Sequence, residues 1–106
     1  MRLLPREQKE RLQQLPTILQ KIKQGAIVYL DEPCDCGSHI RHNDGGNYHA
    51  RIQIAYDDGR YYVKEGSTCR LLPPPEWEEA TEDYVKRLIE EALKEDWDVY
   101  TDREVD

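Results

Sequence analysis

Phenylalanine is absent from this 106-residue chain, and large aliphatic side chains are scarce. Leu, Ile and Val together number 22, about a fifth of the residues. Seven Tyr and two Trp replace part of the missing apolar area, because each aromatic side chain buries a large surface. Residues 1–106 therefore suit one small acidic domain, whose thin core would gain from a staple such as a bound metal.

Long hydrophobic runs are also missing, and no stretch reaches the length needed to cross a bilayer. Leu3 and Leu4 are followed at once by Pro5, so the start of the sequence lacks the apolar region of a secretory signal. The cysteine count of three is odd, which argues against a disulfide framework. These absences predict a cytoplasmic protein with reduced thiols and no membrane contact.

Common catalytic motifs are absent too. Gly45-Gly46 is not followed by the Lys-Ser/Thr of a phosphate loop, and no Gly-x-Ser-x-Gly elbow occurs. Asp57-Asp58 stands before a glycine, where turn residues explain it better than a pair of catalytic carboxylates. The enzymatic alternatives are a Cys69 nucleophile with His49 as its base, a redox pair of Cys34 and Cys36, and a hydrolase that uses a metal-bound water. We therefore expect a non-enzymatic protein.

Charge is distributed unevenly along the chain. Residues 1–25 carry six basic and two acidic side chains (+4), and residues 26–72 carry five and seven (−2). Residues 73–106 carry four and thirteen (−9), which brings the net charge to −7. The basic beginning could bind nucleic acid phosphates, or it could lie against the acidic end of the same chain.

The first 25 residues have the pattern of a helix. Apolar residues recur at helical spacing, namely Leu12, Leu15, Ile18, Leu19 and Ile22. Pro5 suits a first helical position, whereas Pro16 lacks the N–H that an interior position would use. The sequence predicts two short helices, or one kinked at Gln14–Leu15, ending at Gly25.

A hairpin is the clearest local prediction. Residues 48–56 alternate between apolar and polar, Asp58-Gly59 is a strong turn signal, and residues 61–64 continue as a second strand. This turn places Tyr56 opposite Tyr61 and Ile54 opposite Val63. We expect Gly66 to end or bend the second strand. The apolar run 26–30 predicts a strand buried on both faces, or nearly so, which could pair antiparallel with residues 48–56.

A long helix is predicted over Glu76–Asp96, with Trp77, Ala80, Tyr84, Leu88 and Ala92 in one stripe. Trp97, Val99 and Tyr100 could add a short final strand, and residues 101–106 suit a frayed acidic tail. The expected fold class is α+β. A small antiparallel sheet of about three strands would carry a kinked or split N-terminal helix and the long C-terminal helix on one face.

Cys34-Asp35-Cys36 is the sharpest motif, because zinc favours four tetrahedral Cys and His ligands and close cysteines supply half of such a site. The hairpin register brings His49 and Cys69 to its open end, where the segment after residues 26–30 also arrives. We therefore predict a structural Zn²⁺ site of Cys34, Cys36, His49 and Cys69, with His39 or His42 as alternatives to His49. Free thiols with solvated histidines are the competing interpretation.

Two functions compete at this stage. The acidic C-terminal third favours a zinc-stabilised binding module that docks on a basic surface of a protein partner, for instance a phage-type inhibitor of a nucleic-acid-binding protein. The alternative is a zinc-containing nucleic-acid-binding module that uses residues 2–23 or a hairpin face. That face would carry Arg51, Arg60, Lys64 and Arg70 with Tyr62. A plain solvated outer face explains the same residues.

Overall fold

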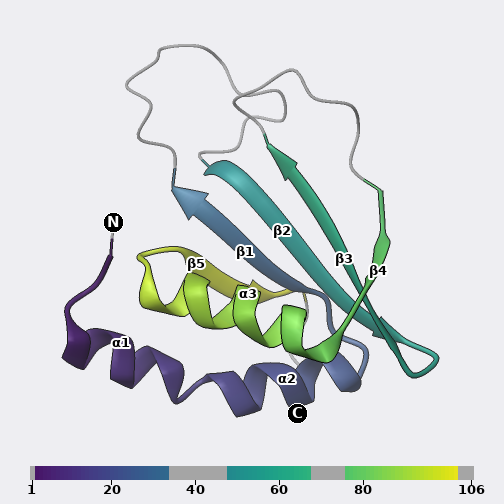
Figure 1. Ribbon diagram of the computed structural model, residues 1–106, viewed down its shortest axis with the longest axis horizontal. Coiled ribbons are helices and arrows are strands. Elements are labelled where there is room, and N and C mark those ends of the chain that lie inside the picture. Colours follow the sequence, from purple (N-terminus) through teal and green to yellow (C-terminus); the bar gives the residue numbers. More distant parts are fainter. Residues whose placement is uncertain (1, 34–47, 68–75, 103–106) are drawn as a thin grey trace.

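A computed structural model describes residues 2–33, 48–67 and 76–102 of the chain. Figure 1 shows the helices packed on one side of a sheet. The helices are α1 (Pro5–Leu12), α2 (Leu15–Lys23) and α3 (Glu82–Lys94), and the strands are β1 (Val28–Pro33), β2 (Tyr48–Asp57), β3 (Arg60–Ser67), β4 (Glu78–Ala80) and β5 (Asp98–Thr101). The expected α+β class, with a split N-terminal helix and a C-terminal helix on an antiparallel sheet, is confirmed.

Two prolines explain the split between α1 and α2. Pro5 and Pro16 each occupy the first turn of their helix, where a missing N–H costs no intrahelical hydrogen bond. Gly25 ends α2 with φ of 103°, a conformation that glycine adopts without a Cβ clash. Both features agree with the sequence prediction.

The sheet has five antiparallel strands in the order β4-β3-β2-β1-β5, so the expectation of about three strands is wrong. The predicted hairpin is confirmed, because Tyr56 pairs with Tyr61 and Ile54 with Val63 around an Asp58-Gly59 turn. The strand continues through Gly66 to Ser67, so Gly66 does not end it. The two additional strands are short edge strands. One of them, β5, is the final strand expected around Val99 and Tyr100, and the other, β4, carries too few residues for a clear alternation.

The C-terminal helix begins six residues later than predicted. Residues 78–80 are extended and pair with β3, which leaves Trp77 outside the helix. Thr81 caps α3, since its side-chain oxygen accepts a hydrogen bond from the Tyr84 amide at 3.1 Å. Within the helix, Lys86 Nζ lies 3.9 Å from Glu82 Oε1, an ion pair between residues one turn apart. The helix therefore starts at its N-cap threonine, which is followed by acidic residues that suit a first turn. The apolar periodicity alone placed this start too early.

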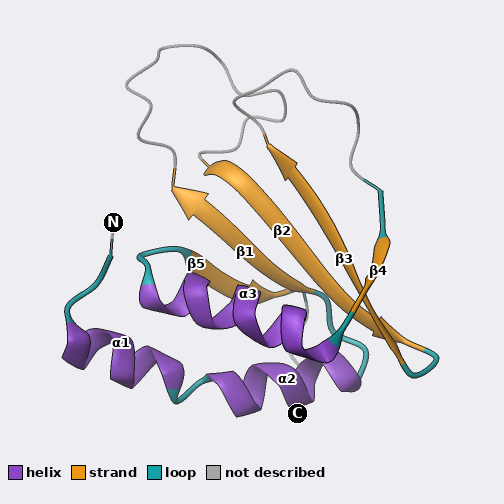
Figure 2. Cartoon of the chain, viewed as in Figure 1, coloured by secondary structure: helices purple, strands orange, loops and turns teal. Residues whose placement is uncertain are grey.

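Figure 2 shows the helices covering one face of the sheet, and the core side chains lie between the two. Every second residue of the strands contacts side chains of α2 and α3 there. The fully buried core residues, from helices and strands together, include Ile22, Val28, Leu30, Ile54, Val85, Ile89 and Leu93. Tyr29 and Tyr100, which alternate with these residues, lie on the opposite face. On that face Tyr29 is half-buried and Asp31 is buried, so the first strand is nearly buried on both faces, which agrees with the weaker form of the prediction.

Candidate functional site

The predicted zinc ligands Cys34, Cys36 and Cys69, and the alternatives His39 and His42, lie outside the described residues. The backbone of His49 belongs to β2. Within the described ranges, no three His, Cys, Asp or Glu side chains form a group able to hold a metal. The zinc prediction is therefore untested by the arrangement of side chains.

The strand ends that flank these cysteines do lie together. Pro33, just before Cys34, pairs with Tyr48, just before His49. Ser67, two residues before Cys69, pairs with Ala50 on the other side of β2. The register thus delivers three segments of the chain to one end of the sheet, as the hairpin prediction required.

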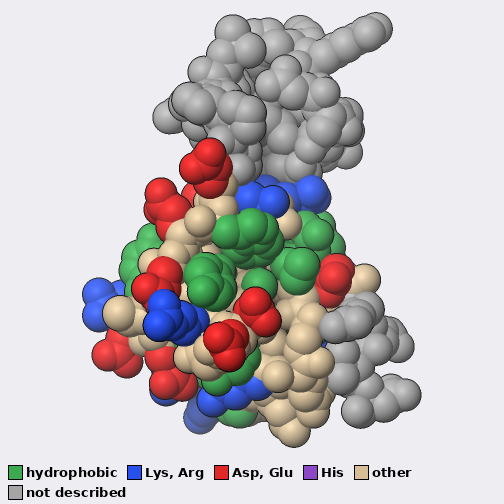
Figure 3. Space-filling model, turned by 90° about the vertical axis from the view of Figure 1, so that its right-hand side faces the viewer, with side chains coloured by type: hydrophobic (Ala, Val, Ile, Leu, Met, Phe, Trp, Pro, Cys, Tyr) green, Lys and Arg blue, Asp and Glu red, His purple; other side chains and the backbone are tan. Residues whose placement is uncertain are grey.

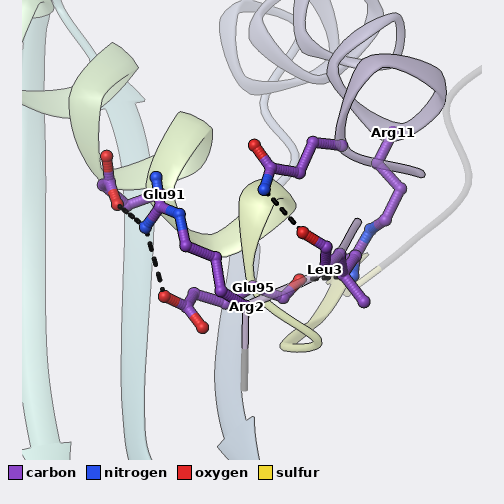
Figure 4. Close-up of polar contacts among 6 residues, drawn as sticks. Arg2, Leu3, Arg11, Glu91 and Glu95 are labelled. Carbon is purple, nitrogen blue, oxygen red and sulfur yellow. Dashed lines mark hydrogen bonds and ion pairs between the residues drawn. The ribbon is translucent and has the colours of Figure 1, made fainter. Parts of the chain in front are cut away.

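The basic N-terminal segment contacts the acidic end of α3, as Figure 4 shows. The Arg2 guanidinium lies 3.4 Å from both Glu91 Oε2 and Glu95 Oε1, and the Leu3 amide donates to the Lys94 carbonyl at 3.0 Å. Arg11 donates to the backbone carbonyls of Glu95 at 2.6 Å and Trp97 at 2.5 Å. Part of the positive charge of residues 2–23 is therefore used inside the molecule.

A groove of about 440 Å³ lies beside this contact, between the end of β1 and the end of α3. Four acidic residues line it, namely Glu32, Glu91, Glu95 and Asp96. Its other lining residues are apolar, namely Pro33, Ile52, Leu88, Ala92 and Trp97. We name this the acidic groove. A side chain with a cationic head and an aliphatic stem matches both parts of it.

The outer sheet face carries a polar network around Asp31, a carboxylate that is only 7 % exposed. Arg51 binds it through Nε at 2.8 Å and Nη2 at 3.1 Å, and the Tyr100 hydroxyl donates to it at 2.6 Å. Tyr29 stacks on Tyr100 with ring centroids 5.2 Å apart, and the Arg51 guanidinium lies 5.1 Å from the Tyr29 centroid. Partial burial and the Asp31 carboxylate raise the pKa of Tyr100 to about 12.

Other cations of the hairpin also have partners. Lys64 Nζ lies 4.8 Å from the centroid of the Trp77 ring, and Arg60 Nη1 lies 3.3 Å from Glu79 Oε1. Seen from the side of β3 and β4, acidic and basic side chains are interspersed with hydrophobic ones (Figure 3). The described part of the face predicted to bind nucleic acid is therefore a mixed surface with internally paired charges. Arg70, the remaining basic residue of that prediction, lies outside the described residues.

Sequence analysis missed the Asp31 network and the acidic groove. Asp31 lies just beyond the predicted strand 26–30, and the final strand expected around Tyr100 had no assigned neighbour, so the pairing of β1 with β5 was not predicted. The groove joins residues that are distant in the chain. The unequal charge of the two ends was its only signal, and that signal did predict contact between them.

None of the described helices has the length and apolar character needed to cross a membrane. Comparison with known proteins finds no matching family model, no similar curated protein and no similar solved structure.

Proposed function

We propose that this protein is a non-enzymatic binding module whose acidic groove docks on a basic surface of a protein partner. The groove carries the proposal, because its acidic and apolar lining residues complement a segment that combines Arg or Lys with aliphatic side chains. A narrower form makes the protein an inhibitor that occupies a nucleic-acid-binding surface of that partner.

Arg2 supports the choice of a cationic partner. Its guanidinium contacts two acidic residues of the groove while its side chain stays 54 % exposed. Exposed ion pairs of this kind contribute at most about 1 kcal/mol, so an incoming basic segment can exchange with Arg2 at little cost. Steering by the surrounding negative charge would raise the association rate more than the final affinity.

Nucleic acid is the second candidate, and the pairing of Arg2, Arg11 and Arg51 with groups of the same chain counts against it. Phosphate binding depends on cations that are available to replace counterions. Titration of labelled single- and double-stranded DNA and RNA at low salt separates the candidates. If the protein binds nucleic acid and does not bind a basic peptide, nucleic acid becomes the preferred candidate.

The structural zinc site of Cys34, Cys36, His49 and Cys69 is part of the proposal, with a reducing cytoplasmic setting that keeps its thiols available. Convergence of the flanking strand ends supports it. Metal content by mass spectrometry tests it on protein purified without chelators. Less than about 0.2 zinc per chain would rule the site out, because structural zinc is held tightly.

The docking test uses a short fluorescent peptide of alternating Arg and Leu as the probe, followed by anisotropy over a range of salt. We expect binding that weakens steeply as salt is added. Glu32→Lys reverses one charge in the groove and should weaken binding about fivefold. Glu76→Lys makes the same charge change at an exposed residue outside the groove and serves as the matched control.

If Glu32→Lys and Glu76→Lys lose equal affinity for the peptide, then net charge, and not the groove, attracts it. Affinity that does not change with salt would remove the steering role of the acidic residues. Glu91→Lys provides a second groove variant, because it also releases one contact of Arg2. Circular dichroism of each variant confirms that the fold is kept.

A further inference from the structure

Residues 2–4 lie against the end of α3, beside the acidic groove, and we name them the strap. The Leu3 amide donates a hydrogen bond to the Lys94 carbonyl at 3.0 Å, and the Gln8 side-chain amide donates to the Leu3 carbonyl at 2.7 Å. These bonds join the strap both to α3 and to α1 (Figure 4). The position of the strap is therefore set by backbone groups as well as by charge.

The strap places a cation on the acidic groove. Nη1 of Arg2 lies 3.4 Å from Glu91 Oε2 and 3.4 Å from Glu95 Oε1, and both glutamates line the groove. A second cation that approaches these carboxylates is repelled by the guanidinium, because like charges at short range repel each other even in water. An incoming basic segment must therefore compete with Arg2 for these two carboxylates.

The strap also has the chemistry that the groove favours in a partner. Arg2 supplies a cationic head, and Leu3 and Leu4 supply aliphatic side chains. The strap is held weakly, because Leu4 stays 57 % exposed and the ion pairs of Arg2 are exposed as well. The core of the described residues includes none of the strap, so the strap can leave the groove while the rest of the domain stays folded.

Arg11 reaches the same end of α3 but contacts different groups. Its guanidinium donates to the backbone carbonyls of Glu95 and Trp97, which belong to the segment that joins α3 to β5. Both residues of this segment line the groove. Arg11 therefore holds the wall of the groove in place, whereas Arg2 neutralises two of its carboxylates. Removing one or the other should change binding in opposite directions.

We infer that the strap is an autoinhibitory element, which competes with the basic partner through Arg2 and is displaced when the partner docks. This inference rests on the proposed function, because it concerns the regulation of the same groove. Displacement breaks the exposed ion pairs of Arg2 and the hydrogen bond from the Leu3 amide. It leaves the contacts of Arg11 intact, so the groove keeps its shape while its charge becomes available.

The test measures the affinity of the whole protein for the fluorescent Arg-Leu peptide by anisotropy at constant, low salt. Arg2→Met removes the competing charge and keeps an apolar stem, so it should bind the peptide about threefold more tightly. Arg11→Met should bind it about threefold more weakly, because the groove wall loses its support. Arg6→Met makes the same charge change at an exposed residue of α1 outside the groove lining, and it should bind as the unchanged protein does.

Hydrogen exchange of the Leu3 amide, followed by NMR, provides a readout that does not depend on affinity. The amide should be protected in the free protein and should lose this protection when the peptide saturates the groove.

Two results would overturn the inference and leave the docking proposal standing. One is equal affinity in Arg2→Met and Arg6→Met, which would show that the strap does not compete. The other is a Leu3 amide that is unprotected in the free protein or stays protected at saturation. If neither the unchanged protein nor Arg2→Met binds the peptide, the proposed function itself fails, and the inference fails with it.

Discussion

The two faces of the sheet are built from alternate residues of the same strands, yet different forces stabilise them. On the inner face, Val28, Leu30 and Ile54 are completely buried beneath the helices. On the outer face, Asp31 and Arg51 form a directional ion pair completed by the hydroxyl of Tyr100. Apolar burial depends on area and not on direction, whereas the ion pair depends on geometry.

This difference shows how a chain with few aliphatic residues covers a five-stranded sheet. The aliphatic side chains are concentrated on one face, and the other face uses tyrosines and charges whose apolar parts pack while their polar ends stay paired. This division predicts that truncating an inner residue lowers the free energy of unfolding strongly. Changing an outer residue should lower it less, and by an amount that depends on pH.

The largest effect should come from Ile54→Ala on the inner face. Ile54 is completely buried, so its truncation removes apolar contacts and leaves a cavity. We expect a loss of about 3 kcal/mol in the free energy of unfolding, measured by urea denaturation. Ala55→Gly, a change at the neighbouring and less buried position, serves as a control for strand propensity. A loss below about 1 kcal/mol in Ile54→Ala would contradict the assignment of the core.

On the outer face, Arg51→Met should have the largest effect. It leaves the Asp31 carboxylate, only 7 % exposed, without its bidentate partner. We expect a loss of about 2 kcal/mol, below the range for a fully buried pair because the Arg51 side chain is 28 % exposed. Asp31→Asn in the same protein should recover part of the loss. Additive effects of the two changes would show that the pair is not coupled.

Tyr100→Phe tests the network through its pH dependence. In the folded protein the pKa of Tyr100 is raised from 10.0 to about 12, mainly by partial burial and then by its hydrogen bond to Asp31. The neutral hydroxyl is thus favoured by folding, so its contribution is complete below pH 10 and disappears as the pH rises through about 12.

We expect Tyr100→Phe to cost about 1 kcal/mol at neutral pH, a value reduced for the solvent exposure of the ring. The difference in unfolding free energy between the variant and the unchanged protein should then shrink between pH 10 and pH 12. Tyr62→Phe, on the same face, is the matched control. A difference that stays constant over this range would mean that the hydroxyl does not titrate with folding.

The hairpin and the split helix could be predicted from sequence because each depends on local chemistry. Asp58-Gly59 sets the register of β2 and β3, and Pro5 and Pro16 set the starts of two helices. Of the two edge strands, β5 matches the short final strand expected around Val99 and Tyr100, whereas β4 was not predicted. Residues 78–80 have helical periodicity with the segment that follows, and their pairing with β3 overrides it.

The candidate sites were harder to predict than the fold. The acidic groove needs β1, β2 and α3 to be placed together, and the Asp31 network needs β1 to lie between β2 and β5. Only the contact between the basic and acidic ends could be expected from the sequence. The charge of each end can be counted without knowing the fold. The exact partners, such as Arg2 with Glu91, required the fold.

The smallest effect should come from Lys64→Met, which makes the same kind of change as Arg51→Met on the same face. Lys64 lies over the ring of Trp77, which is 40 % exposed, and this contact holds no buried carboxylate. An exposed cation–π contact is worth about 0.5 kcal/mol, so urea denaturation should show a loss of that size or less. Met keeps the apolar stem, which isolates the effect of the charge. Equal losses in the two variants would mean that general charge on the outer face, and not the buried Asp31, sets the cost of removing Arg51.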